Sequence, residues 1–172
     1  MQHQTNTKMN MTNLRSGIRQ TLLAAALAAG LATALTARAQ DILPREEAMK
    51  LALVATLQAP TTSDTPIQVD ADLKRPLAGQ DGEYGLLILP ETKLSAAVIE
   101  AAGKSPIPVG QLWLKKLTPM VDGSPVDSGK LRMISVRHDG ESHSVPLCLL
   151  GVRKTDAGGL ELVVYSKGKE PL

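Results

Sequence analysis

Apolar residues recur in a helical pattern in one segment of this 172-residue chain. Between residues 44 and 58 they return every three or four positions, which places a broad apolar stripe along a helix. Pro44 suits the first helical position, and Glu46 and Glu47 lie where the helix dipole favours negative charge. The apolar face consists of Ala48, Leu51, Ala52 and Ala55. We therefore predict a helix over 44–58, ended by the polar stretch 59–66.

The period changes to two after residue 66. Residues 67–73 alternate apolar and polar side chains, as a strand with one solvated face does. Further strands are predicted over 84–89, 109–117, 131–136, 145–152 and 160–165. Turns rich in Gly and Asp separate them, notably at 78–82 and 138–141. A short second helix is expected over 93–102, ended by Gly103.

Hairpin spacing between the last three predicted strands favours an antiparallel sheet. Residues 145–152 form the most apolar run after residue 40, so we predict a buried central strand there. Pro146 has no N–H for the ladder, so this strand is expected to begin at Pro146 or to contain a bulge. The expected fold is α+β and mainly β. It is a small antiparallel sheet or partly closed sandwich of about six strands, covered by one or two helices.

The first 39 residues have the three-part layout of a cleavable secretory signal peptide. The positive start contains Lys8, Arg15 and Arg19 and no acidic residue. Residues 22–35 form an apolar core, and Ala37 and Ala39 frame an A-x-A motif. Cleavage is therefore expected between Ala39 and Gln40. The apolar core is shorter than the ~20 residues of a membrane-spanning helix, so no stable anchor is expected after cleavage.

Cleavage would leave a single domain, residues 40–172, and reverse the sign of the net charge. The full chain carries a formal charge of +2. The signal contains four of the 19 Lys and Arg residues and no Asp or Glu, so 15 basic residues remain against 17 acidic ones, a net charge of −2. No basic patch remains to favour nucleic acid. The three aromatic residues, Tyr84, Trp113 and Tyr165, are too few to stack several bases or sugars.

The segment 44–73 resembles the helix-then-strand start of exported PepSY-type modules. The shared features are the amphipathic helix that opens Pro44-Arg-Glu-Glu, the linker after it and the predicted strand 67–73. Beyond this segment the chain departs from that family, because an all-apolar strand and a second helix stand where the family continues its hairpin. We assign no family from this resemblance.

His138, Asp139, His143 and Cys148 lie within 11 residues of one another. A hairpin turn brings the two histidines together, and with Cys148 they are ligands that suit copper or zinc. A second interpretation is a Cys–His hydrolase, with Cys148 as nucleophile, a histidine as base and Asp139 orienting it. The competing interpretation places the histidines beside a turn and Cys148 in the core. The spacing matches no compact zinc motif, and the apolar residues around Cys148 disfavour a thiolate.

Four carboxylates form another candidate set, suited to calcium binding or to acid–base catalysis. They are Asp70, Asp72, Asp81 and Glu83. Strand alternation and turn chemistry explain the same residues as a solvated face and a turn. Trp113 also has two interpretations, a packed core residue or an exposed anchor for a partner, and its being the only tryptophan of a small domain favours the core. The chain contains no nucleotide-binding, serine-hydrolase or zinc-protease motif.

These patterns favour an exported, non-enzymatic binding or interaction protein of the periplasm or extracellular space, with no cofactor expected. The grounds are the signal, a domain large enough for its own core, and the lack of a catalytic motif. The strand edge at 67–73 is the expected place for a protein partner to add a strand. The alternative is a periplasmic metal-binding protein or Cys–His hydrolase that uses His138, His143 and Cys148.

Overall fold

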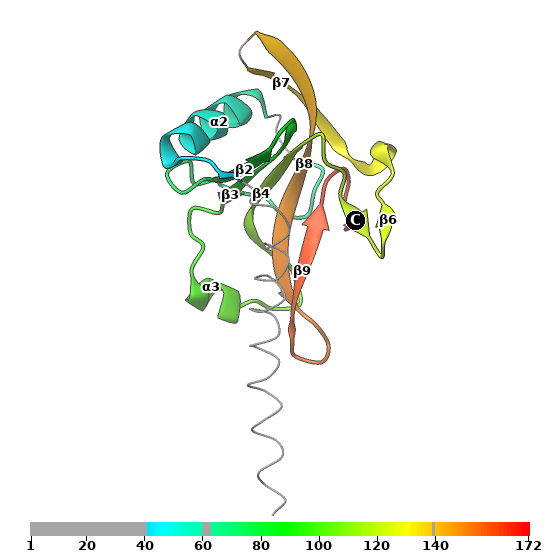
Figure 1. The fold of residues 1–172 in the computed structure, drawn as a ribbon. Coiled ribbons are helices and arrows are strands. Elements are labelled where there is room, and N and C mark those ends of the chain that lie inside the picture. Colours follow the sequence, from blue (N-terminus) through cyan, green and yellow to red (C-terminus); the bar gives the residue numbers. More distant parts are fainter. Residues whose placement is uncertain (1–40, 60–62, 139) are drawn as a thin grey trace, which may run out of the picture. The chain divides into compact units, whose positions relative to one another are not determined.

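A computed structural model describes residues 41–59, 63–138 and 140–172 of the chain. The chain divides into the units Met1–Gln40 and Asp41–Leu172. The predicted signal peptide and its cleavage site fall in the first unit and lie outside the described residues. In the second unit, helix α2 lies against an antiparallel sheet, while α3 lies apart from it near the other end of the sheet (Figure 1). The elements in order are β1 (Asp41–Ile42), α2 (Arg45–Gln58), β2 (Leu77–Asp81), β3 (Tyr84–Pro90), α3 (Ala96–Glu100), β4 (Ile107–Lys115), β5 (Met120–Val121), β6 (Ser124–Pro125), the 3-10 turn Ser128–Lys130, β7 (Arg132–His138), β8 (Glu141–Lys154) and β9 (Leu160–Tyr165).

Strand β8 organises the sheet. The strand order is β1-β2-β3-β4-β8-β7, with β9 also paired to β8, which makes seven antiparallel strands in the described residues. Strand β7 pairs with the first half of β8, and β9 pairs with the second half. Both lie along one edge of β8, because β4 occupies the other edge from Leu147 to Val152. The antiparallel, mainly β fold and both C-terminal hairpins were therefore predicted correctly.

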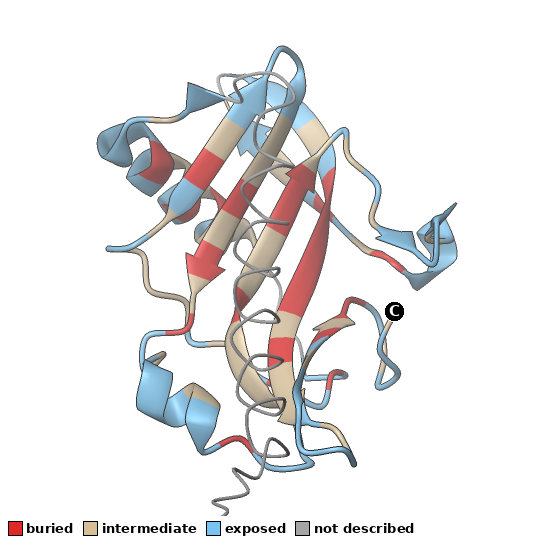
Figure 2. Ribbon diagram, turned by 60° about the horizontal axis from the view of Figure 1, so that its bottom comes forward, coloured by how far each residue is buried: buried red, intermediate tan, exposed pale blue. Residues whose placement is uncertain are grey.

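The core lies on the face of the sheet that α2 covers. Ala48, Ala52 and Ala55 are buried on the helix, and their small side chains let its backbone come close to the strands. Leu89, Leu147 and Leu149 meet this face with at most 1% of their surface exposed. Burial of each such leucine is worth about 1.5–3 kcal/mol. Buried positions accordingly follow the central strands and the sheet-facing side of α2 (Figure 2).

The predicted strand at 67–73 is wrong. Only Ala71 forms a bridge, to Glu91, and the rest of the segment is an irregular crossing. The segment is held by a few bonds to residues just after β3 instead of a ladder: the Asp70 amide donates to a Glu91 carboxylate oxygen, and the Thr92 amide donates to the Asp70 carbonyl. Ile67 is buried, so the alternating pattern predicted the burial of this residue correctly. It predicted the secondary structure of the segment incorrectly. The expected edge for a partner strand is therefore absent at 67–73.

The predicted turn at 78–82 is also wrong in most of its length. Residues up to Asp81 belong to β2, which pairs with β3, and the reversal is confined to Gly82 and Glu83. Gly82 has a φ of +58°, a conformation that favours glycine. Gly79 and Asp81 gave the segment the composition of a loop, although β3 supplies a complete ladder partner.

Two smaller expectations differ from the structure. The second helix spans only Ala96–Glu100, because the Ser95 hydroxyl caps it by accepting from the Val98 amide. Pro146 lies inside its strand, because β8 begins at Glu141. The pairing of β8 with β7 has no bulge at this residue. Pro146 pairs with Met133 on β7, and the register with β4 starts one residue later, so its missing N–H falls where the β4 ladder has ended.

Candidate functional site

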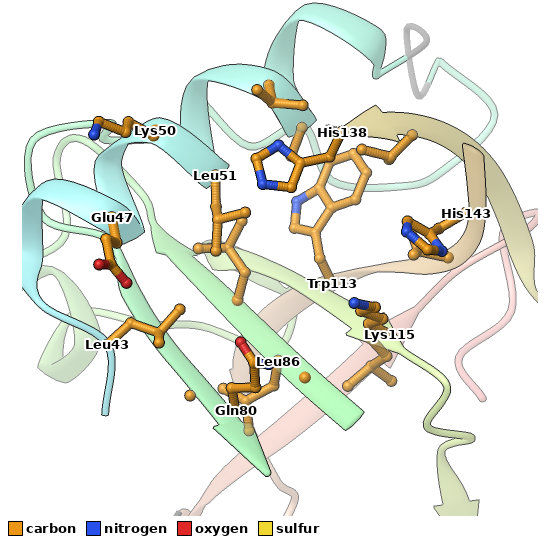
Figure 3. Close-up of a pocket in the computed structure, with 18 residues that line it drawn as sticks. Leu43, Glu47, Lys50, Leu51, Gln80, Leu86, Trp113, Lys115, His138 and His143 are labelled. Atoms are coloured by element: carbon orange, nitrogen blue, oxygen red, sulfur yellow. The ribbon is translucent and has the colours of Figure 1, made fainter. Parts of the chain in front are cut away.

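A groove of about 400 Å³ lies between α2 and the sheet. Its lining comes from α2, β2, β3, β4, β7 and β8, so it exists only once these elements are assembled (Figure 3). The apolar part of the lining includes Leu51, Val54, Leu87, Trp113, Val136 and Val145. This volume and lining are typical of sites that bind small molecules.

Trp113 forms one wall of the groove. It lies on β4 directly across from Leu87 on β3 and Leu147 on β8, so three neighbouring strands present apolar side chains on one face. Only 4% of its surface is exposed, which confirms the interpretation of Trp113 as a core residue. Its indole N–H donates to the side-chain oxygen of Gln111 at 3.1 Å. The ring is therefore fixed in orientation with its polar atom satisfied.

Gly85 keeps part of the groove open. It lies on β3 between Gln80 of β2 and Lys115 of β4, and all three line the groove. A Cβ added at Gly85 would meet Lys115 and the Gly79 carbonyl at 3.6 Å, which is ordinary contact. Neither the backbone conformation nor the immediate space therefore demands glycine here. Its effect is to leave out a side chain where the groove would otherwise be filled.

Polar side chains surround the apolar lining. Glu47 and Lys50 come from α2, Gln80 from β2, Lys115 from β4, His138 from β7 and His143 from β8. The ring nitrogen Nε2 of His143 lies 3.5 Å from a carboxylate oxygen of Glu141. The β7–β8 register pairs Val136 with His143 and His138 with Glu141, so both histidines lie on the groove face of the sheet.

The predicted metal or hydrolase cluster does not converge. His138 and His143 line the groove, but Cys148 lies five positions after His143 on the same strand and so faces the opposite side of the sheet. Cys148 is fully buried, as expected for a core residue. Burial raises the pKa of its thiol, and a hydrogen bond with Ser166 opposes that rise only in part. Asp139 lies outside the described residues.

The four candidate carboxylates do not form a cluster, and two of them are engaged in ion pairs. Arg75 bonds the side chain of Asp72 and lowers the pKa of that carboxyl, and Lys116 does the same to the pKa of Glu83. Asp81 closes β2 opposite Tyr84, and the Asp70 carbonyl accepts from the Thr92 hydroxyl. In the part of the chain that the structure describes, no three Cys, His, Asp or Glu side chains come together as metal ligands do.

Sequence reasoning did not find the groove. Its members come from six elements, and the strand register that aligns them is a tertiary property. One signal was available, however. His143 and Val145 share a parity along β8 that Cys148 does not, so the separation of His143 from Cys148 follows from counting residues on a strand.

Comparison with known proteins gives no relative to guide the assignment. No family model, no curated protein and no solved structure matches the chain. The resemblance of 44–73 to PepSY-type modules gains no support from these searches, and its strand is absent. Within the described residues, no helix has both the length and the apolar character needed to cross a membrane.

Proposed function

We propose that this chain is an exported, non-enzymatic binding protein whose groove between α2 and the sheet holds a small apolar ligand. The observation that carries the proposal is the groove itself, lined by apolar side chains from five elements and bounded by Trp113. A pre-formed concavity of about 400 Å³ suits a small molecule better than a protein surface.

The proposal of a non-enzymatic role rests on what faces the groove. Its titratable side chains are Glu47, Lys50, Lys115, His138 and His143. Cys148, the only cysteine of the chain, lies on the other face of the sheet, so a Cys–His pair cannot act in the groove. The alternative metal or hydrolase site therefore lacks Cys148 in the groove, which favours a role in ligand binding.

A neutral, solvent-sensitive dye such as Nile red tests the binding proposal. We expect its emission to shift to the blue on addition of the protein. Gly85→Val, which places a side chain in the groove with only ordinary contact to the Gly79 carbonyl and Lys115, should weaken binding of the dye by about tenfold or more. Gly103→Val is the matched control, because a Cβ at Gly103 meets nothing within 4 Å and Gly103 does not line the groove. Equal binding by the two variants, both folded by circular dichroism, would contradict the proposal.

Export is tested separately. We expect expression in a host with a general secretion system to yield a product whose N-terminus is Gln40, because the A-x-A motif ends at Ala39. Intact-mass measurement of the exported fraction checks this. A full-length product retained in the cell would contradict export and leave the groove proposal standing.

A further inference from the structure

Lys115 is a cationic residue of the groove lining. On α2, Glu47 and Lys50 lie one turn apart, so their charges offset each other. At the other side, Glu141 is engaged by His143, and Glu83 by Lys116. Among the described residues, Lys115 forms no ion pair. Glu83 pairs with Lys116 and also attracts Lys115 electrostatically, but neither Glu83 nor Glu141 lines the groove, so no carboxylate shares this end of the lining with the Lys115 ammonium.

His143 lies on the same side of the groove as Lys115 (Figure 3). Lys115 follows Trp113 at the end of β4, and His143 and His138 lie on the next two strands, β8 and β7, on the same face of the sheet. Figure 3 shows the side chains of Lys115 and His143 on one side of the groove, with Glu47 and Leu43 on the other. Two acidic residues lie near this end outside the groove lining: Glu141, directly across from His138, and Glu83, which attracts Lys115. The groove therefore has a polar end that donates hydrogen bonds and an apolar remainder.

From this arrangement we propose that the ligand is an amphipathic monocarboxylate, an apolar body that carries one carboxylate, seated with its charged group against Lys115. The inference rests on the proposed function and adds the chemical class of the ligand. A carboxylate accepts strong hydrogen bonds from an ammonium and from an imidazole N–H, and it supplies a negative charge that this end of the lining does not contain. The apolar body then covers Trp113, Leu51 and Val54, which lie in the same groove.

Three probes with the same ten-carbon chain separate charge from hydrophobicity: decanoate, 1-decanol and decyltrimethylammonium. Trp113 is the only tryptophan of the chain and lines the groove, so its emission reports binding directly. We expect decanoate to bind the purified protein about tenfold more tightly than decanol, the effect of one charge-assisted hydrogen bond. The cationic probe should bind more weakly than either.

Lys115→Met is the decisive variant, since it keeps the length of the side chain and removes the charge. It should abolish the preference for decanoate, so that decanoate and decanol bind about equally. Lys115→Arg should retain the preference. Lys154→Met is the matched control, because Lys154 is an exposed residue at the end of β8 that does not line the groove.

The outcomes distinguish this inference from the proposed function. If decanol binds as tightly as decanoate, or if the preference survives in Lys115→Met, the carboxylate assignment is wrong and apolar binding stands. Preferential binding of the cationic probe also overturns the carboxylate assignment. If none of the probes changes the emission of Trp113 and Nile red does not bind, both proposals fail together.

Discussion

The hydroxyl of Ser166 donates a hydrogen bond to the carbonyl of Leu147 at 2.7 Å, and both residues are almost completely buried. This contact lies where the partner of β8 changes, because Leu147 is the last residue of β8 that pairs with β7 and Leu149 is the first that pairs with β9. The same hydroxyl accepts from the amide of Arg132 at 2.8 Å. Ser166 therefore joins three strands at a point where the regular ladder is interrupted.

Replacing Ser166 with alanine should destabilise the protein by about 1–3 kcal/mol, because it leaves a buried carbonyl and a buried amide without their partner. Urea denaturation followed by circular dichroism measures the change. Ser142→Ala is the control: among the described residues this exposed hydroxyl bonds the Ser135 hydroxyl alone, and its loss should cost less than about 0.5 kcal/mol. Equal losses of stability in the two variants would show that the buried hydrogen bonds of Ser166 add no more stability than an exposed hydroxyl does.

Gly110→Ala should also destabilise the fold, by about 1–3 kcal/mol. Gly110 follows the bulge in β4, and a Cβ there would approach the Leu89 carbonyl oxygen to 2.7 Å, closer than real Cβ contacts occur. The backbone of β3 or β4 must then shift. Gly103→Ala, which meets nothing within 4 Å, supplies the comparison in the same denaturation experiment. If the Gly110→Ala protein is as stable as the natural chain, β3 and β4 can move apart at little cost in free energy.

The thiol of Cys148 should be unreactive in the native protein. It is fully buried, and burial raises the pKa of the thiol, so little thiolate is present and reagent has no access. We expect labelling by a thiol reagent at pH 8 to follow the rate of unfolding and to become rapid in concentrated urea. Rapid labelling without denaturant, with native circular dichroism, would contradict the burial of this residue.

Acid should weaken the contact between Asp64 and Arg132. A hydrogen bond from the Arg132 side chain is the largest cause that lowers the pKa of Asp64 below its ordinary value of 3.8. A carboxyl with a lowered folded pKa adds stability at pH values above 3.8, and that stability is lost as the pH falls through the folded pKa. Asp64→Asn should therefore be less stable than the natural chain at pH 7 and equally stable near the acid limit. Denaturation at both pH values checks this, and a difference that persists in acid would argue against the ion pair.

Local patterns were sufficient to predict the elements whose signals are self-contained. The helix at 44–58 was predicted from its apolar stripe and the strand at 160–165 from an apolar run after a Gly-rich turn, and the structure gives α2 and β9 at nearly the same bounds. The prediction was wrong for two segments, for opposite reasons. Residues 67–73 have a strand period but no adjacent strand to pair with along their length, whereas 77–81 have a loop composition and a complete partner in β3.

The candidate site depended on register, which no single segment contains. Lys115 and Gln80 have the pattern of ordinary solvated positions, and their placement around Gly85 follows only from the pairing of β2, β3 and β4. The clustering of His138 and His143 was predictable from the hairpin turn. The inclusion of Cys148 with them was an error of parity along one strand.

Strand β8 has a consequence for the order in which the protein folds. Its pairings with β7 and β9 join residues close in sequence, whereas its pairing with β4 must close the long connection between Lys115 and Glu141. Contacts that close long loops form more slowly than local ones. We therefore expect a C-terminal three-stranded unit to form first and the pairing of β4 to follow. Because the groove needs both β4 and the β7–β8 hairpin, the capacity to bind a ligand should arise late in folding, after most of the secondary structure is present.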